Sequence, residues 1–194
     1  MIFNKRFFFI FITFLIFSNL KAQESLIFDI ARNGSLLELK TSIKEDSNSI
    51  NKLSKEGYSA LTLACYYGNN DVATYLVKHV KDINSKSGYG TPLMAATVKK
   101  NSYLVKLLLE NNANPNLTDL NSSSALHYAV IFKQQEIIEL LMKYKANPNI
   151  KDNRGNVLRR VQKTFKNLVN MNNLAMLKLT ARHFPSFSLR ILMI

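Results

Sequence analysis

The sequence predicts an all-α solenoid, in which helix-turn-helix units with extended hairpin loops stack side by side. Two observations carry this prediction. Short apolar runs built on Leu61, Leu93 and Leu126 recur at spacings of 32 and then 33 residues. An asparagine also ends each unit, at spacings of 33, 32 and 33 residues: Asn51, Asn84, Asn116 and Asn149. Fixed spacing of this length is typical of repeat arrays, in which each unit buries its apolar face against its neighbour.

The first element, residues 1–22, has the pattern of a secretory signal peptide. Lys5 and Arg6 form a basic start, residues 7–17 are apolar apart from Thr13, and Ala22 offers a small residue at a cleavage point. A membrane-spanning helix needs about 20 apolar residues, which is more than this stretch holds. Cleavage is therefore favoured over retention as a membrane anchor, and we expect an exported protein.

Cysteine usage points to the compartment. Cys65 is the only cysteine, so the chain cannot form an internal disulfide. Its place in an apolar run predicts a small buried side chain. An exported chain that is rich in Asn and Lys and has no disulfide fits a bacterial envelope protein better than a eukaryotic secreted one. We expect a periplasmic or secreted bacterial location.

The positive charge is concentrated at the C-terminal end. The chain carries a formal net charge of +13, of which residues 1–22 contribute +3 and residues 151–194 contribute +8. Residues 23–150 are nearly balanced at +2. A binding mode that depends on positive charge would therefore belong to the C-terminal segment and not to the array.

Each central unit reads as a short helix rich in small residues, a turn, a second helix and a polar loop. Thr91 and Pro92 suit the start of a helix, because Thr can cap free amides and Pro fits the first turn. Gly34 and Gly68 mark the turn between helices, where we expect a positive φ. Lysines replace glycine at this turn in the next two units, namely Lys100 and Lys133.

These residues resemble the ankyrin repeat. Residues 90–96 read Gly-Thr-Pro-Leu-Met-Ala-Ala, and residues 124–129 read Ser-Ala-Leu-His-Tyr-Ala, close to the Thr-Pro-Leu-His pattern of that family. The resemblance implies an array over residues 23–152. Its expected parts are an N-terminal cap over about 25–56 that lacks Thr-Pro, and repeats over about 57–87, 88–119 and 120–152.

The segment 153–194 is expected to be a divergent or incomplete C-terminal repeat or cap. Leu158 lies 32 residues after Leu126, and candidate helices follow at 158–171 and 174–182. After Leu179 the expected repeat ending is missing. Three interpretations stay open for residues 180–194: a divergent cap, a membrane-surface tail, or an ending altered by a change of reading frame.

The sequence offers no catalytic, cofactor or metal site. His79, His127 and His183 are not spaced as metal ligands, and no phosphate-binding loop or nucleophile elbow is present. Glu136 and Glu139 share a helix face, where carboxylates are usually solvated. His127 occupies the His position of the ankyrin pattern, which implies a structural role. We expect no enzyme activity.

The resemblance implies that a partner docks on the loop tips and on the exposed side of the first helices. Aromatic residues at these positions would form a strip along a concave groove, and aromatics supply much of the energy of protein interfaces. In the alternative, Tyr66 and Phe132 fill gaps between units. The candidate binding residues are Tyr58, Tyr66, Tyr67, Tyr89, Lys99, Ile131, Phe132 and Arg154.

The function expected from these features is an exported, monomeric protein-protein interaction module that binds no nucleic acid. The first alternative is binding of an anionic surface, lipid head groups or an envelope polymer, through the basic C-terminal segment. Membrane contact would be limited to that segment or the signal segment. A further alternative is a chaperone-like partner that stabilises a toxin or enzyme in the same compartment.

Overall fold

The protein is a stack of helix pairs. The computed structural model describes residues 26–87, 90–153 and 155, and residues 26–33 form its first helix. The helices after it are α2 (Leu36–Glu45), η1 (Ser49–Asn51), α3 (Ala60–Tyr67), α4 (Asn70–His79), α5 (Pro92–Val98), α6 (Ser102–Glu110), α7 (Ala125–Ile131) and α8 (Gln135–Lys143). The all-α prediction is confirmed for the described residues.

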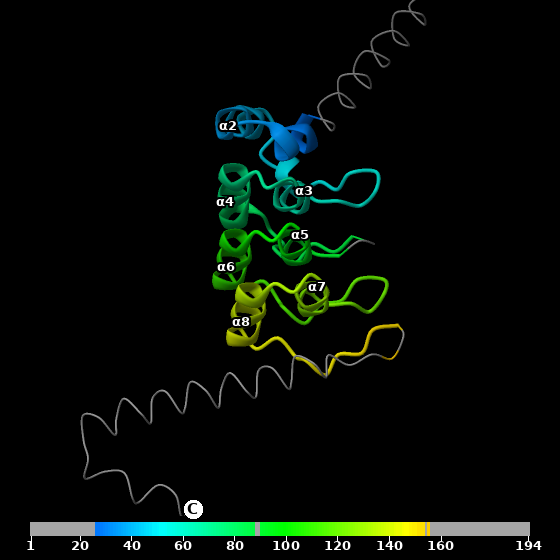
Figure 1. Ribbon diagram of the computed structural model, residues 1–194. Helices are drawn as coiled ribbons and strands as arrows, with labels where there is room; N and C mark the ends of the chain where they lie inside the picture. Colours follow the sequence, from blue (N-terminus) through cyan, green and yellow to red (C-terminus); the bar gives the residue numbers. More distant parts are fainter. Residues whose placement is uncertain (1–25, 88–89, 154, 156–194) are drawn as a thin grey trace, which may run out of the picture.

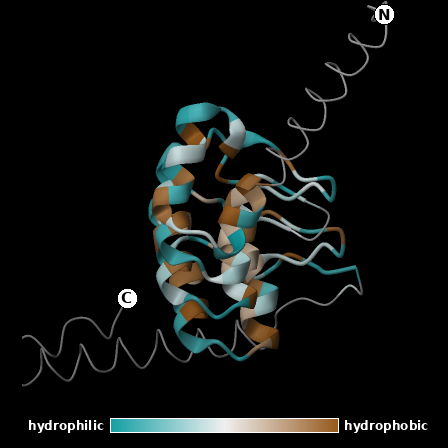
Figure 2. Cartoon of the chain, turned by 90° about the horizontal axis from the view of Figure 1, so that it is seen from above, coloured by the Kyte–Doolittle hydropathy of each residue, from teal (hydrophilic) through white to brown (hydrophobic). Residues whose placement is uncertain are grey.

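The helices form two layers (Figure 1). The inner layer holds α3, α5 and α7, and the outer layer holds α2, α4, α6 and α8, with each helix packed against its counterpart in the next unit. Loops project from the inner layer and are mostly hydrophilic, whereas apolar residues concentrate on the helices (Figure 2). Single β-bridges close three of these loops as hairpins: Leu53 with Ser59, Ser87 with Gly90, and Thr118 with Ser124.

The repeated leucines form the centre of the core. Leu61, Leu93 and Leu126 are each at most 1% exposed. They sit in short helices made largely of small residues, which lets neighbouring units approach closely, and residues 60–65 of α3 are all buried. Cys65 is among them, as the sequence predicts. Burial of each leucine contributes roughly 1.5–3 kcal/mol to the free energy of unfolding. Stacking of the units is therefore the main source of stability.

A positive φ in the turn between paired helices explains one of the two turn glycines, Gly68, and not the other, Gly34. Gly68 ends α3 with a φ of 74°, as expected, and Lys100 and Lys133 adopt the same left-handed conformation at 57° and 55°. The expectation for Gly34 is wrong, because Gly34 is not among the glycines with positive φ. A side chain there would meet the Cα of Ile30 at 2.6 Å, so close packing is the reason for this glycine.

Hydrogen bonds with the period of the repeat link successive loops. In each of these bonds, an asparagine side-chain oxygen accepts a backbone N–H from the next unit. This N–H lies in a loop, so no helix or sheet supplies an acceptor for it. These bonds join Lys81 N to Asn51 Oδ1 at 2.8 Å, Asn114 N to Asn84 Oδ1 at 2.8 Å, and Asn147 N to Asn116 Oδ1 at 2.7 Å. The periodic asparagines therefore fix the register between units.

A second set of polar bonds joins the turns of neighbouring units. The amide of Asn69 donates to the carbonyl of Gly34 at 2.8 Å, and the amide of Gln134, two units later, donates to the carbonyl of Thr97 at 2.9 Å. Each donor lies just before the second helix of its pair. Both edges of the stack are thus held by side chains that bond the backbone of a neighbouring unit: the loop asparagines bond the next unit, and the turn amides bond the preceding one.

His127 caps the first helix of the last described pair. Its side chain is 3% exposed, and its Nδ1 accepts the backbone N–H of Ser124 at 3.1 Å. Burial lowers the pKa of His127, against the opposing effects of Asp152, the Ile150 backbone and Asp119. The expected structural role of this histidine is therefore supported by its contacts, and the neutral ring is the form that fits the fold.

The expected signal segment and most of the C-terminal segment, residues 1–22 and 156–194, lie outside the described residues. Within the part of the chain that the structure describes, no helix is both long enough and apolar enough to span a bilayer.

A pH experiment tests the role of His127. Because its folded-state pKa lies below the ordinary value near 6.5, the neutral ring stabilises the fold above that pH, and this contribution is lost as the pH falls towards the folded pKa. Urea unfolding should show a fall in the free energy of unfolding between about pH 7.5 and about pH 5.5. In His127→Gln, whose amide can still accept the Ser124 N–H as in a capping box, this fall should be smaller. An equal fall in both proteins would contradict the assignment.

Candidate functional site

One face of the inner helices lies beside the loops. Positions recur with the repeat, so Leu63, Ala95 and Tyr128 are equivalent, and one turn later Tyr66, Val98 and Ile131 are equivalent. The next position holds Tyr67, Lys99 and Phe132. Positions spaced by three and four residues share a helix face, so α3, α5 and α7 present one continuous surface beside the loops.

This surface is hollowed into a groove of about 560 Å³. It crosses several units, because its lining comes from the 26–33 helix, the first loop, α3, α5 and α7. We call it the inner groove. Its lining residues are Arg32, Glu56, Tyr58, Thr62, Leu63, Tyr66, Tyr67, Met94, Ala95, Val98 and Tyr128. Four of these are tyrosines, so the groove is aromatic and can still form hydrogen bonds.

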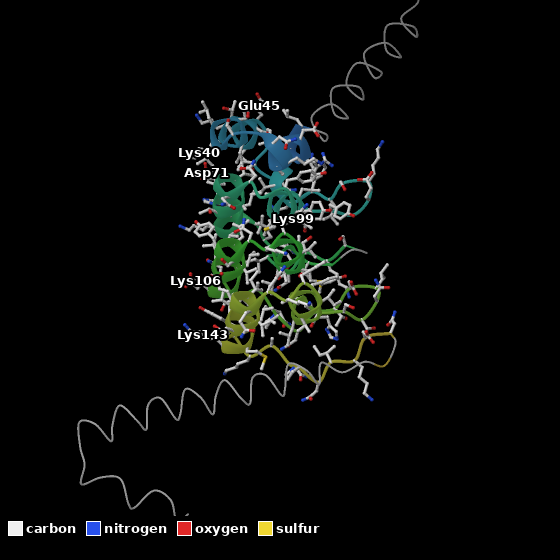
Figure 3. The ribbon with its side chains drawn as sticks, in the orientation of Figure 1. Lys40, Glu45, Asp71, Lys99, Lys106 and Lys143 are labelled. Atoms are coloured by element: carbon white, nitrogen blue, oxygen red, sulfur yellow. The ribbon has the colours of Figure 1, made fainter. Side chains whose placement is uncertain are left out.

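Tyr66 and Tyr67 are the most informative residues of the groove. Tyr66 is 42% exposed and Tyr67 is 53% exposed. Their rings meet edge to face, with centroids 5.4 Å apart at an interplanar angle of 71°. Lys99, labelled in Figure 3 at the end of α5, places its Nζ 4.1 Å from the centroid of the Tyr66 ring. This cation–π contact fixes a positive charge at the rim of the groove.

Other charges at the rim are partly compensated. The Arg32 guanidinium donates to the Asp29 carboxylate at 2.8 Å, within the 26–33 helix. The Ser54 hydroxyl donates to Glu56 at 2.9 Å, and this bond is the main reason that the pKa of Glu56 lies below its usual value. Glu56 is therefore ionised at neutral pH. The groove thus offers both signs of charge around an aromatic floor.

Tyr128 is fixed at the far end of the groove. Its hydroxyl donates to the carboxylate of Asp119, a buried residue that also accepts the backbone N–H groups of Asn121 and Ser123 at 2.8 and 2.9 Å. Burial, together with the bond to Asp119, raises the pKa of Tyr128 to about 12. The phenol therefore stays protonated and ties the loop to α7, so this wall of the groove is rigid.

The structure brings some of the sequence-predicted residues together and leaves others apart. Tyr58, Tyr66 and Tyr67 line the groove, and Lys99 contacts Tyr66. Tyr58 is only half-exposed, because its ring packs partly against the core. Ile131 and Phe132, 65% and 41% exposed, continue the same surface on α7 but are not among the residues that line the hollow. Tyr89 and Arg154 lie outside the described residues.

Sequence reasoning missed Tyr128. Its position holds Leu63 in α3 and Ala95 in α5, so the repeat pattern does not mark it as a binding position. The available signal was the residue type itself, because a tyrosine hydroxyl favours a position where it finds a polar partner.

No catalytic constellation is evident among the described residues. No group of three or more His, Cys, Asp or Glu side chains in that part of the chain could hold a metal ion. The Cys65 thiol is buried, and burial raises its pKa far above the usual value, so it does not act as a nucleophile. His79 stacks on Tyr75 with ring centroids 3.9 Å apart and bonds the Tyr75 carbonyl at 2.7 Å. Its contacts are local to α4.

Comparisons with known proteins agree with this geometry. The family model for ankyrin repeats (3 copies) matches residues 27–119 and 80–152. The chain is 31% identical over 112 residues to human BCL-6 corepressor-like protein 1, covering 57% of this chain and 6% of that protein. It is 43% identical over 70 residues to human Ankyrin repeat and KH domain-containing protein 1, covering 36% of this chain and 3% of that protein.

A bacterial relative extends the comparison. The chain is 40% identical over 76 residues to an ankyrin repeat-containing protein of Treponema pallidum (strain Nichols), covering 39% of this chain and 26% of that protein. The chain thus spans about a quarter or less of the length of each of these relatives. The likeness concerns the repeats, and the matched family model covers more than half of this chain. The chain belongs to the ankyrin-repeat family.

Proposed function

We propose that this protein is an interaction module that binds another protein in the inner groove and has no catalytic role of its own. Ankyrin repeats generally mediate protein-protein interaction, and the groove is the surface of the described residues best suited to it. The single observation that carries the proposal is the pair Tyr66 and Tyr67, two large rings that stand side by side in a hollow and are about half exposed.

A cluster of aromatic rings exposed to water is unfavourable in free energy unless another surface covers it. Contiguous apolar surface on a soluble protein usually marks a contact site, and Tyr is enriched among the residues that contribute most to binding. Neither ring is needed for the core, since stacking of α3 rests on residues 60–65. Their exposure is therefore better explained by a partner than by the stability of the array.

The groove is suited to binding with little loss of conformational entropy. Its floor belongs to helices whose other faces are buried, and Tyr128 is held by Asp119. Lys99 is held by the Tyr66 ring. A surface that is ordered before binding avoids the cost of ordering side chains at the interface. The partner should present an apolar or aromatic side chain to the tyrosines, with charged groups placed to meet Lys99 and Glu56 at the rim.

We further propose that the protein is exported and meets its partner in the bacterial periplasm or outside the cell. The support is the basic start, the short apolar stretch and the small residue at Ala22. In that compartment the partner could equally be a protein that the array stabilises, such as a toxin or enzyme, because a stabilising partner would use the same groove.

Mass spectrometry of the protein recovered from a bacterial host tests the export proposal. We expect cleavage after Ala22, so the recovered chain should begin at Gln23 and should be found in the periplasmic or extracellular fraction. Replacing Ala22 by a bulky residue should block this cleavage, because signal cleavage requires a small side chain. Recovery of the intact N-terminus in the cytoplasm would contradict export.

Replacement of one groove tyrosine tests the binding proposal. A partner identified by co-purification should bind Tyr67→Ala about 10-fold to 100-fold more weakly than the parent, because loss of a central interface aromatic typically costs 2 kcal/mol or more. The Kd would be measured by calorimetry, and circular dichroism would establish that the variant is folded.

Tyr103→Ala is the matched control. Tyr103 is also 53% exposed, but it lies on α6 in the outer layer, where its hydroxyl bonds Thr74 at 3.1 Å. Its removal should leave the Kd unchanged. Equal effects of both replacements would refute the groove as the binding site. A different result would support anionic-surface binding through the basic segment. In that case Tyr67→Ala would leave the Kd unchanged, the affinity would fall steeply with salt concentration, and deletion of residues 151–194 would abolish binding.

A further inference from the structure

Lys99 carries the charge of the inner groove that no carboxylate among the described residues balances. Arg32 forms an ion pair with Asp29 at 2.8 Å. A hydrogen bond is the main cause of the lowered pKa of Glu56, and the nearby charges of Arg32 and Lys55 lower this pKa further. Lys99 forms no ion pair with any residue that the structure describes. The groove and its rim therefore hold three cations against two carboxylates, and the excess positive charge lies at Lys99.

The Lys99 ammonium is held in position and still has donors to offer. Its Nζ lies 4.1 Å from the centroid of the Tyr66 ring, and the side chain is exposed. An ammonium has three N–H donors, and a ring below it occupies only one side of the group. The remaining donors can bind a carboxylate of a partner without loss of the contact with Tyr66.

The distances set how close this carboxylate lies to the aromatic rings. A carboxylate oxygen bonded to Lys99 Nζ at about 2.8 Å is at most about 7 Å from the centre of the Tyr66 ring. The centre of the Tyr67 ring lies 5.4 Å beyond that of Tyr66. An extended chain advances about 3.3–3.6 Å per residue. Residues one or two positions apart in an extended segment can therefore supply both the carboxylate and a side chain that covers the rings.

Two other kinds of ligand fit these charges less well. A cationic side chain would have to displace the Lys99 ammonium from the Tyr66 ring, and the two like charges would repel each other. A nucleic-acid strand would bring its phosphates close to the carboxylates of Glu56 and Asp29. Residues 23–150 as a whole carry only +2, which is little for binding a phosphate backbone.

We propose that the inner groove selects an extended acidic peptide segment, in which an Asp or Glu side chain binds Lys99 and a neighbouring aromatic or large apolar side chain packs on Tyr66 and Tyr67. This inference rests on the proposed function, because it names the chemistry of the partner that the groove takes. Lys99 sets the specificity, since it attracts a carboxylate and repels a cation at the same point.

Selection from a phage-displayed library of random peptides, with the full chain as bait, tests this proposal. Enriched peptides should carry Asp or Glu one or two positions from an aromatic or large apolar residue. On Lys99→Glu, a preference for Lys or Arg should replace the acidic preference, because the variant reverses the charge.

Lys40→Glu is the matched control for this selection. Lys40 also lies over a ring, with its Nζ 5.8 Å from the centroid of Tyr75. It belongs to α2 in the outer layer, whereas Lys99 follows α5 in the inner layer (Figure 3). The variant makes the same change of charge away from the groove, so it should select the same peptides as the parent.

A double-mutant cycle with one enriched peptide measures the contact itself. Replacing the carboxylate of the peptide by the corresponding amide should weaken its binding to the parent about 10-fold. The same replacement should weaken binding to Lys99→Met by less than about 2-fold, because the charge that the carboxylate meets is gone. The Kd values would be measured by calorimetry, and circular dichroism would establish that each variant is folded.

The outcomes separate this inference from the proposed function. Peptides that bind Tyr67→Ala weakly but show no acidic preference would overturn the inference and leave the groove as the binding site. Equal losses on the parent and on Lys99→Met in the cycle would do the same. Displacement of the peptides by a single-stranded thymidine oligonucleotide would assign the groove to nucleic acid and overturn the inference as well. Failure to enrich any peptide, or peptides that bind Tyr67→Ala as tightly as the parent, would overturn both.

Discussion

Stacking of one helix pair on the next is the interaction on which the rest of this structure depends. A single pair cannot bury both of its apolar sides, so each unit is stable only when a neighbour covers it. Leu61, Leu93 and Leu126 lie at these contacts and are almost completely buried. Small residues around them let the inner helices approach, and asparagine side chains join the loops at the same period.

The same constraint produces the binding surface. Because stacking uses one set of positions on each inner helix, the positions that face the loops are free to vary, and successive units bring them side by side. The inner groove is the result, with rings from α3 and α7 and the Lys99 ammonium from α5. Rigid units hold these side chains in place, so the surface exists before any partner arrives, and its chemistry can change without loss of the fold.

Features that repeat in every unit could be predicted from the sequence, whereas features that depend on one local contact could not. Periodic leucines and asparagines predict the stack well, because their role repeats in every unit. Gly34 was misjudged and Tyr128 was missed because each acts through one local contact, a close approach to Ile30 and a bond to Asp119. Phe132 was expected in the groove, yet the hollow ends at Tyr128, and where a hollow ends depends on side-chain volumes that no spacing reveals.

The free energy of unfolding of Leu93→Ala tests the stacking account most directly. Leu93 lies between neighbouring units and is 1% exposed, so its truncation should cost about 2–5 kcal/mol in denaturant unfolding. Leu120→Ala removes the same atoms from a loop residue that is 74% exposed, and it should change stability by no more than about 0.5 kcal/mol. Losses of similar size in the two variants would contradict the account.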